Sequence, residues 1–214
     1  MWFFDLATLE SNPTILKTAI ATFDAYFQSE IGDGTRINVL SKLPVAGALL
    51  GRKASTEFLI ANQIMTSEVN PLANRMDLRE GFQTTSAQRL GRAAEALNYA
   101  LCQSVPPAPG KEPVIRVFPA WPDRWSAQFT LLCRGNFLVT SSLKEGKVEF
   151  VEIVSQAGSH CRIRNPWPGA TVMIFRNGKK WKSSADDLVS FKTAAGDRFI
   201  LVLKGDSPEM IRQV

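Results

Sequence analysis

The sequence has few residues of the types that most often form metal sites or nucleophilic triads. Its 214 residues include three cysteines, Cys102, Cys133 and Cys161, and a single histidine, His160. The cysteines are widely spaced and form no CxxC pair, so a zinc site or a redox dithiol is not expected, and each is interpreted as a small buried hydrophobic residue. A Ser-His-Asp or Cys-His triad would have to use His160, beside Cys161, and this position does not favour one. Carboxylates are the expected agents of any chemistry, and neither a cofactor nor a metal is expected.

Long apolar runs and a basic leader are also lacking. No run approaches the roughly 18–20 apolar residues of a membrane-spanning helix, so no membrane partner is expected. Residues 1–5 contain no lysine or arginine and make a poor secretory signal. The sequence therefore does not indicate the compartment. A longer parent protein with a leader before Met1 would be periplasmic or secreted. With 45% hydrophobic residues, the chain is expected to fold.

The positive charge is concentrated in the second half of the chain. Residues 1–105 hold nine basic and ten acidic residues, whereas residues 106–214 hold sixteen basic and ten acidic ones. Apart from short groups such as Lys179, Lys180 and Lys182, the cations are scattered among positions typical of strands. They indicate a solvated sheet face, so no nucleic-acid partner is expected.

The first half of the chain has the periodicity of amphipathic helices. Asn12 and Pro13 are a typical helix start, an N-cap residue followed by proline at the first helical position. Apolar residues then recur at steps of three and four: Ile15, Leu16, Ala19, Ile20, Phe23 and Phe27. Gly32-Asp33-Gly34 is expected to end this helix.

Three further helices are predicted before residue 105. The first covers about residues 36–50, with a kink or a late start at Pro44, and is closed by Gly51. The second covers about residues 55–65, with Ser55 as its cap. The third covers about residues 86–102, where apolar residues follow a 3-4-3-4 spacing and small residues favour close helix packing.

The period changes after residue 105. Val-Pro-Pro-Ala-Pro-Gly at 105–110 cannot continue a helix. Beyond it, apolar residues alternate with period two, as in 127–133 and 137–141, and turn signals such as Asn177-Gly178 separate about eight short strands. The sequence therefore predicts an α+β chain: a helical segment (1–105), a Pro-rich connector (106–122) and a C-terminal antiparallel β-sandwich (123–214).

Three runs make the sequence recognisable: Val-Phe-Pro-Ala-Trp-Pro at 117–122, Gly-Asn-Phe-Leu-Val-Thr at 135–140 and Cys-Arg-Ile-Arg-Asn-Pro at 161–166. In this order, behind helical hairpins and a polar loop, they resemble the C-terminal part of glycoside hydrolase family 95, inverting enzymes of the α-L-fucosidase type. In that family an (α/α)6 toroid carries the active site and leads into a β-sandwich. The resemblance implies that residues 1–105 correspond to the last helices of such a toroid and that the general acid lies earlier, outside this chain.

The family's catalytic base is an acid on a loop before the final helix of the toroid. Residues 79–83, Arg-Glu-Gly-Phe-Gln, hold that place, so the resemblance implies that Glu80 is a candidate general base. Where the family has aspartate followed by asparagine, this sequence has Glu80 and Gly81. Nearby residues suited to binding sugar hydroxyls are Asn74, Arg75, Arg79 and Gln83. From the residues alone, Glu80 is equally well a solvated loop acid paired with Arg79.

The second half of the chain contains four tryptophans, Trp121, Trp125, Trp167 and Trp181. They can be interpreted in two ways. Their flat faces could stack on sugar rings, with Trp121 as a candidate substrate-binding residue, or they could seal the sandwich against the helices. Three hypotheses follow. The chain is the C-terminal part of a glycoside hydrolase with an oligosaccharide or glycan substrate, a non-catalytic carbohydrate-binding or interaction module, or a structural domain that forms a homodimer through an exposed helical face.

Overall fold

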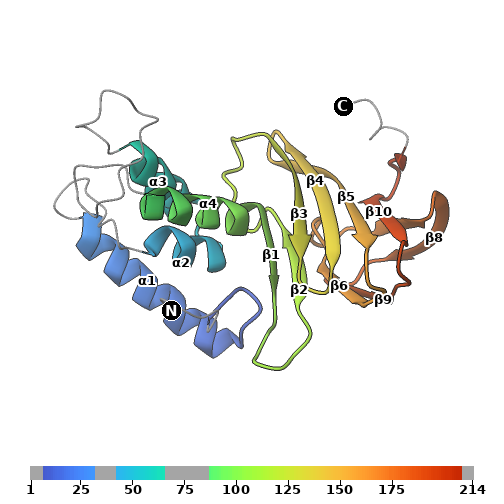
Figure 1. Cartoon of the computed structure of the whole chain (residues 1–214), viewed down its shortest axis with the longest axis horizontal. Helices are drawn as coiled ribbons and strands as arrows, with labels where there is room; N and C mark the ends of the chain where they lie inside the picture. Colours follow the sequence, from blue (N-terminus) through green and yellow to red (C-terminus); the bar gives the residue numbers. More distant parts are fainter. Residues whose placement is uncertain (1–6, 32–41, 66–86, 209–214) are drawn as a thin grey trace. The chain divides into compact units, whose positions relative to one another are not determined.

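The computed structural model describes residues 7–31, 42–65 and 87–208 (Figure 1). The chain divides into two compact units. The helical unit comprises Met1–Leu101 together with Pro119–Pro122, and the β unit comprises Cys102–Phe118 and Asp123–Val214. Residues 106–118 of the expected connector therefore fall in the β unit and residues 119–122 in the helical unit. The predicted α+β class, with helices preceding a β-sandwich, is confirmed.

The first helix begins where the sequence predicts. Helix α1 spans Pro13–Ile31. The backbone N–H of Thr14 donates to the Asn12 side-chain oxygen at 2.9 Å, and the N–H of Leu16 donates to the Asn12 carbonyl at 2.9 Å. Asn12 is thus the N-cap and Pro13 occupies the first helical position, where its missing N–H costs no hydrogen bond.

Helices α2 (Leu43–Leu49) and α3 (Lys53–Met65) are joined by a tight turn at Gly51. The N–H of Gly51 donates to the carbonyl of Ala48, and the N–H of Arg52 donates to that of Gly47. This is a Schellman motif, and Gly51 takes the left-handed conformation (φ 68°) that the motif requires. The late start at Pro44 is confirmed, whereas Ser55 as a cap is wrong: α3 begins two residues earlier, and the N–H of Thr56 donates to Arg52.

Helix α4 (Ala87–Leu101) confirms the prediction for residues 86–102 and supplies small buried residues. Ala93, Ala96 and Ala100 are at most 2% exposed. Side chains this small allow helices to approach closely. The segment Pro119–Pro122 packs at the end of α4, where the N–H of Ala120 donates to the Ala100 carbonyl at 3.3 Å.

The described residues of the β unit form ten strands, two more than the eight or so expected. They are β1 (Cys102–Val105), β2 (Val114–Val117), β3 (Ala127–Cys133), β4 (Phe137–Lys144), β5 (Lys147–Ser155), β6 (His160–Arg164), β7 (Val172–Arg176), β8 (Lys179–Ser184), β9 (Leu188–Lys192) and β10 (Arg198–Leu203). They form a four-stranded sheet of order β1-β2-β6-β9 and a six-stranded sheet of order β3-β4-β5-β10-β7-β8. Among the described residues, all strand pairings are antiparallel except that of β2 with β6, which is parallel at Ile115 and Ile163.

The two sheets face each other across an apolar core. Phe191 of β9 and Phe199 of β10 belong to different sheets, and their ring centroids lie 4.6 Å apart. The predicted alternation holds on β3, where Phe129 and Cys133 are buried between exposed residues. Strand β10 is buried on both faces, and Ile200 and Val202 join an apolar cluster with Phe150, Met173 and Phe175. Apolar residues of the β unit are therefore packed on both faces of β10.

The hairpin turns confirm the strongest local signals. Asn177 and Gly178 have φ values of 51° and 81° and join β7 to β8 across the pair Arg176 and Lys179. Positive φ at both central residues is the geometry of a two-residue hairpin, which Asn-Gly adopts readily. Within the described residues, no helix is long and apolar enough to cross a membrane.

Candidate functional site

The predicted catalytic loop lies outside the described residues. Glu80, the candidate base, belongs to the stretch 66–86, and so do the four candidate sugar-binding residues Asn74, Arg75, Arg79 and Gln83. Their roles stay predictions. Among the predicted site residues, the structure therefore places only Trp121.

Trp121 is a partly buried residue of the helical unit. It packs, together with Tyr99, against a cluster of fully buried small residues, Ala48, Ala100 and Ala120. These alanines come from α2, α4 and the Pro119–Pro122 segment, so the indole helps to hold that segment against two helices. This contact is a packing role, and substrate binding by Trp121 stays a prediction.

Two of the other tryptophans differ from the flat exposed platforms that sugars stack on. Trp167 is only 9% exposed, and its indole N–H donates to the Val148 carbonyl at 2.9 Å. Trp167 is thus a core residue, and its use as an exposed sugar platform is wrong. Trp181 is 40% exposed, but the Lys182 ammonium lies 4.9 Å and the Arg176 guanidinium 5.8 Å from its ring centroid. These cations are within the range of cation–π attraction.

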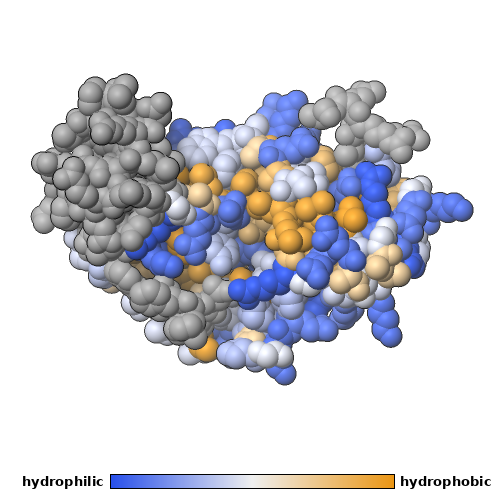
Figure 2. Space-filling view, in the orientation of Figure 1, coloured by the Kyte–Doolittle hydropathy of each residue, from blue (hydrophilic) through white to orange (hydrophobic). Residues whose placement is uncertain are grey.

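The side of the sandwich at β8 and β9 combines aromatic and basic side chains. Trp181 contacts Phe191 and Phe199, with ring centroids 5.7 and 5.6 Å away. On the face shown in Figure 2, apolar side chains gather over the strands of the β unit and hydrophilic ones surround them. The lysines of β8 are mostly exposed, which is typical of an edge strand protected against pairing with other chains.

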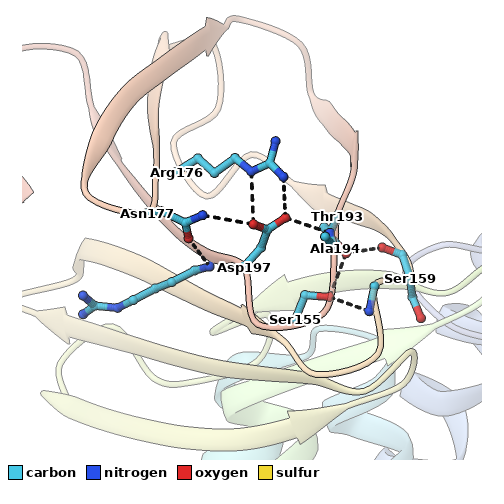
Figure 3. Close-up of polar contacts among 9 residues, drawn as sticks. Ser155, Ser159, Arg176, Asn177, Thr193, Ala194 and Asp197 are labelled. Carbon is cyan, nitrogen blue, oxygen red and sulfur yellow. Dashed lines mark hydrogen bonds and ion pairs between the residues drawn. The ribbon is translucent and has the colours of Figure 1, made fainter.

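Asp197 is a carboxylate held by several hydrogen bonds (Figure 3). Its two oxygens accept hydrogen bonds from the Arg176 guanidinium at 3.2 and 2.7 Å, from the Asn177 side chain at 3.0 Å and from the Ala194 N–H at 2.7 Å. Chiefly because of the Arg176 hydrogen bond, the pKa of Asp197 falls to about 2. A carboxylate held ionised in this way ties the β10 turn to the β7–β8 hairpin and is unsuited to act as a general acid.

The single histidine lies in a chain of three side chains on the outer face of the four-stranded sheet. His160 Nδ1 is 3.0 Å from Glu112 Oε2, and His160 Nε2 is 2.8 Å from Ser190 Oγ. The neighbouring Cys161 is fully buried and points to the opposite face, so the two do not form a Cys-His pair. The order serine, histidine, glutamate is that of a triad, but His160 is 39% and Glu112 57% exposed to solvent. An exposed chain of this kind gives the histidine none of the desolvation on which a nucleophilic site depends.

Cys102 and Cys133, which are far apart in the sequence, lie together in the core. Cys102 Sγ and Cys133 Sγ are 3.4 Å apart, although the residues are 31 positions apart in the sequence. The interpretation of the cysteines as buried residues is confirmed, and the proximity of this pair is a contact that no spacing motif could have indicated. Within 7–31, 42–65 and 87–208, no group of three or more His, Cys, Asp or Glu residues could hold a metal ion.

Comparison with known proteins finds a similarity for most of the β unit. Residues 110–201 match the family model described as glycoside hydrolase family 95, C-terminal domain. No match was found among curated proteins. The chain is thus similar to a glycoside hydrolase in its C-terminal portion, as the sequence runs at 117–122, 135–140 and 161–166 predict.

Similar solved structures include a GH127 β-L-arabinofuranosidase from Geobacillus stearothermophilus T6, with 9% identity, a TM-score of 0.31 and coverage of 74% of this chain and 30% of that one. A second is titled a glycoside hydrolase, with 13% identity, a TM-score of 0.33 and coverage of 78% and 32%. A third is a GH127 β-arabinofuranosidase, with 10% identity, a TM-score of 0.30 and coverage of 78% and 32%. This chain spans about a third of the length of each of these structures.

Proposed function

We propose that this chain is the C-terminal part of an inverting glycoside hydrolase of the α-L-fucosidase type, acting on an oligosaccharide or glycan. The observation that supports the proposal is the family match of residues 110–201. In the sequence, this match follows the helical segment and a polar, acid-bearing stretch. In this proposal, the helical unit supplies the last helices of a toroid. The other helices and the general acid belong to a preceding part of the protein.

Glu80 acts as the general base of the proposed reaction. An inverting glycosidase uses one carboxylate to activate water and a protonated carboxyl about 6.5–9.5 Å away to assist departure of the leaving group. Glu80 takes the first role, and Asn74, Arg75, Arg79 and Gln83 bind the hydroxyls of the sugar. In this proposal the second carboxyl belongs to the preceding part of the protein, so the 214-residue chain is inactive by itself.

The surface of the helical unit is compatible with further helices packing on it. Ile15 and Tyr26 of α1 are 52% and 43% exposed, and Phe58 of α3 is 37% exposed. Exposed large apolar side chains can mark a contact surface. In the proposal they contact the rest of the toroid. In the 214-residue chain alone, the same residues would form the homodimer predicted from the sequence.

The test compares the 214-residue chain with a chain extended at its N-terminus, using a panel of aryl glycosides that includes an α-L-fucoside. We expect no turnover by the shorter chain. In the longer chain, Glu80→Gln should lower kcat by at least about 100-fold, the range of general-base catalysis. Glu68→Gln, which changes a neighbouring acid outside the predicted site, serves as the matched control and should leave kcat unchanged. Turnover by the shorter chain, or full activity of the Glu80→Gln variant, would contradict the proposal.

A glycan-binding module is the alternative function. It requires an exposed aromatic platform, and after the assignment of Trp167 to the core the remaining candidates are Trp121, Trp125 and Trp181. Glycan-array binding that survives Glu80→Ala and is lost on Trp125→Ala would support the module over the enzyme. Binding that is unaffected by all three tryptophan substitutions would exclude these side chains as the platform.

A further inference from the structure

We propose that Cys102 and Cys133 are a site of covalent modification, an intramolecular disulfide that joins the two sheets of the β unit. Their sulfur atoms lie 3.4 Å apart, and both residues are 7% exposed. A disulfide requires an S–S distance of about 2.05 Å, so each sulfur has to move by less than 1 Å. This inference does not depend on the proposed glycosidase function.

The backbone around the two cysteines already holds them in place. Cys102 begins β1, and Cys133 ends β3. Two residues further along β1, the Ser104 hydroxyl accepts a hydrogen bond from the N–H of Arg134 at 2.9 Å. This contact and the sulfur pair are two links between β1 and the end of β3. In the proposal, the sulfurs approach by side-chain motion while these contacts hold the backbone.

The proposed disulfide would join edge strands of the two sheets. Strand β1 is the edge of the four-stranded sheet, and β3 is the edge of the six-stranded sheet. A disulfide between them would close one side of the sandwich covalently. On the opposite side, the edge strands β8 and β9 are joined by ring contacts and a lysine hydrogen bond.

The two thiols have the inequality that thiol–disulfide exchange uses. The pKa of Cys133 is lowered because its sulfur accepts a hydrogen bond from the Cys102 thiol, whereas that hydrogen bond and burial raise the pKa of Cys102. Because its pKa is the lower of the two, we assign the first attack to the sulfur of Cys133. The third cysteine, Cys161, is fully buried, and burial raises its pKa to about 12, so it stays a thiol.

The reaction uses a small-molecule disulfide such as oxidised glutathione as the oxidant. The Cys133 thiolate attacks one sulfur of the oxidant, whose S–S bond breaks and releases one glutathione thiolate. The Cys102 thiol then loses its proton and attacks the Cys133 sulfur of the mixed disulfide, which releases the second glutathione. Two protein thiols are oxidised, and one glutathione disulfide is reduced to two thiols.

The experiment counts thiols in the 214-residue chain before and after incubation with oxidised glutathione. Maleimide alkylation in denaturant and intact-mass measurement should give three labels on the reduced chain and one on the oxidised chain. Peptide mapping should place that label on Cys161 and show a linked Cys102–Cys133 peptide. Three labels after oxidation, a link that includes Cys161, or only intermolecular dimers would overturn the proposal.

Matched variants separate the bond from a general effect of oxidant. In Cys161→Ala the oxidised chain should carry no label, whereas Cys102→Ala should carry one label and one bound glutathione, because the mixed disulfide at Cys133 has no second thiol to resolve it. The oxidised wild type should melt more than about 8 °C above the reduced form, since the cross-link encloses about 30 residues. An equal shift in Cys102→Ala would contradict the assignment. The thiol count of the wild type remains decisive should a variant fail to fold.

Discussion

The side-chain ammonium of Lys182 donates a hydrogen bond to the backbone carbonyl of Ser190 at 3.1 Å. These residues belong to β8 and β9, the outermost strands of different sheets. The same ammonium lies 5.3 Å from the ring centroid of Phe191, which is buried in the core. One lysine thus combines a hydrogen bond between the sheets with contacts to two aromatic rings.

Lys182→Met should lower the free energy of unfolding by about 1 kcal/mol. Methionine keeps the aliphatic packing but loses the hydrogen bond to Ser190 and the attraction to the Trp181 ring. Urea denaturation followed by tryptophan fluorescence measures the change. Lys179→Met, at the exposed hairpin end of the same strand, is the control and should change the stability by less than about 0.5 kcal/mol. Equal effects of the two substitutions would argue against a specific role of Lys182.

Asp197 should make the β unit sensitive to acid. Its pKa in the folded chain is about 2, below the ordinary value of 3.8, because Arg176 binds the ionised form. The stabilisation is therefore complete above about pH 5 and is lost as the pH falls through 4 toward 2. Melting temperatures measured from pH 7 to pH 2 should fall less steeply for Asp197→Asn, which starts from a lower value at pH 7. The exposed control Asp206→Asn should follow the wild-type curve, and parallel curves for all three chains would contradict the assignment.

Two helical glycines offer a matched pair of substitutions to alanine. A Cβ atom at Gly47 would lie 3.0 Å from Thr56 Oγ1 and 3.1 Å from Phe23 Cζ, whereas one at Gly91 would meet nothing within 4 Å. We expect Gly47→Ala to destabilise the helical unit by about 1–3 kcal/mol through overpacking. Gly91→Ala should stabilise it by about 0.5–1 kcal/mol through helix propensity. Circular dichroism melts at 222 nm measure both, and changes of the same sign would contradict the packing described for α2.

Trp167→Phe should lower the free energy of unfolding of the β unit by about 2–4 kcal/mol. The substitution removes the hydrogen bond to the Val148 carbonyl and leaves a cavity in a core position. Trp181→Phe makes the same substitution at a residue that is 40% exposed, and it should lower the free energy of unfolding by a smaller amount. Urea unfolding monitored by far-UV circular dichroism gives both values. A larger effect at Trp181 would reverse the roles assigned to the two tryptophans.

The parts of the fold that could be predicted are those specified by neighbouring residues. Asn12 and Pro13 start α1, and Asn177 and Gly178 turn β7 into β8, because a cap and a hairpin turn depend on a few adjacent side chains. The β-sandwich followed from period two in the same way. Ser55 failed as a cap because the backbone of Arg52 takes that place after the Gly51 turn.

What the sequence did not indicate depends on contacts between distant residues. Strands β1 and β2 surround a proline-rich stretch and carry little alternation, and they become strands by pairing with each other and with β6. The pair Cys102 and Cys133 and the chain from Glu112 through His160 to Ser190 likewise join residues 30 to 48 positions apart. The candidate site at residues 74–83 came from the family resemblance, since polar residues by themselves carry no pattern specific to glycoside hydrolysis.

The division of the chain into units has a consequence for how it can be inherited or cut. Because Pro119–Pro122 belongs to the helical unit while the residues on either side belong to the β unit, the polypeptide passes between the units three times, after Leu101, Phe118 and Pro122. A single cut after Leu101 keeps the β unit in one piece, as residues 102–214, but removes Pro119–Pro122 from the helical unit. A cut after Pro122 keeps the helical unit whole but takes β1 and β2 from the β unit, and a cut after Phe118 leaves both units incomplete. Gene fusion or recombination at one breakpoint can therefore transfer an intact helical unit only together with β1 and β2.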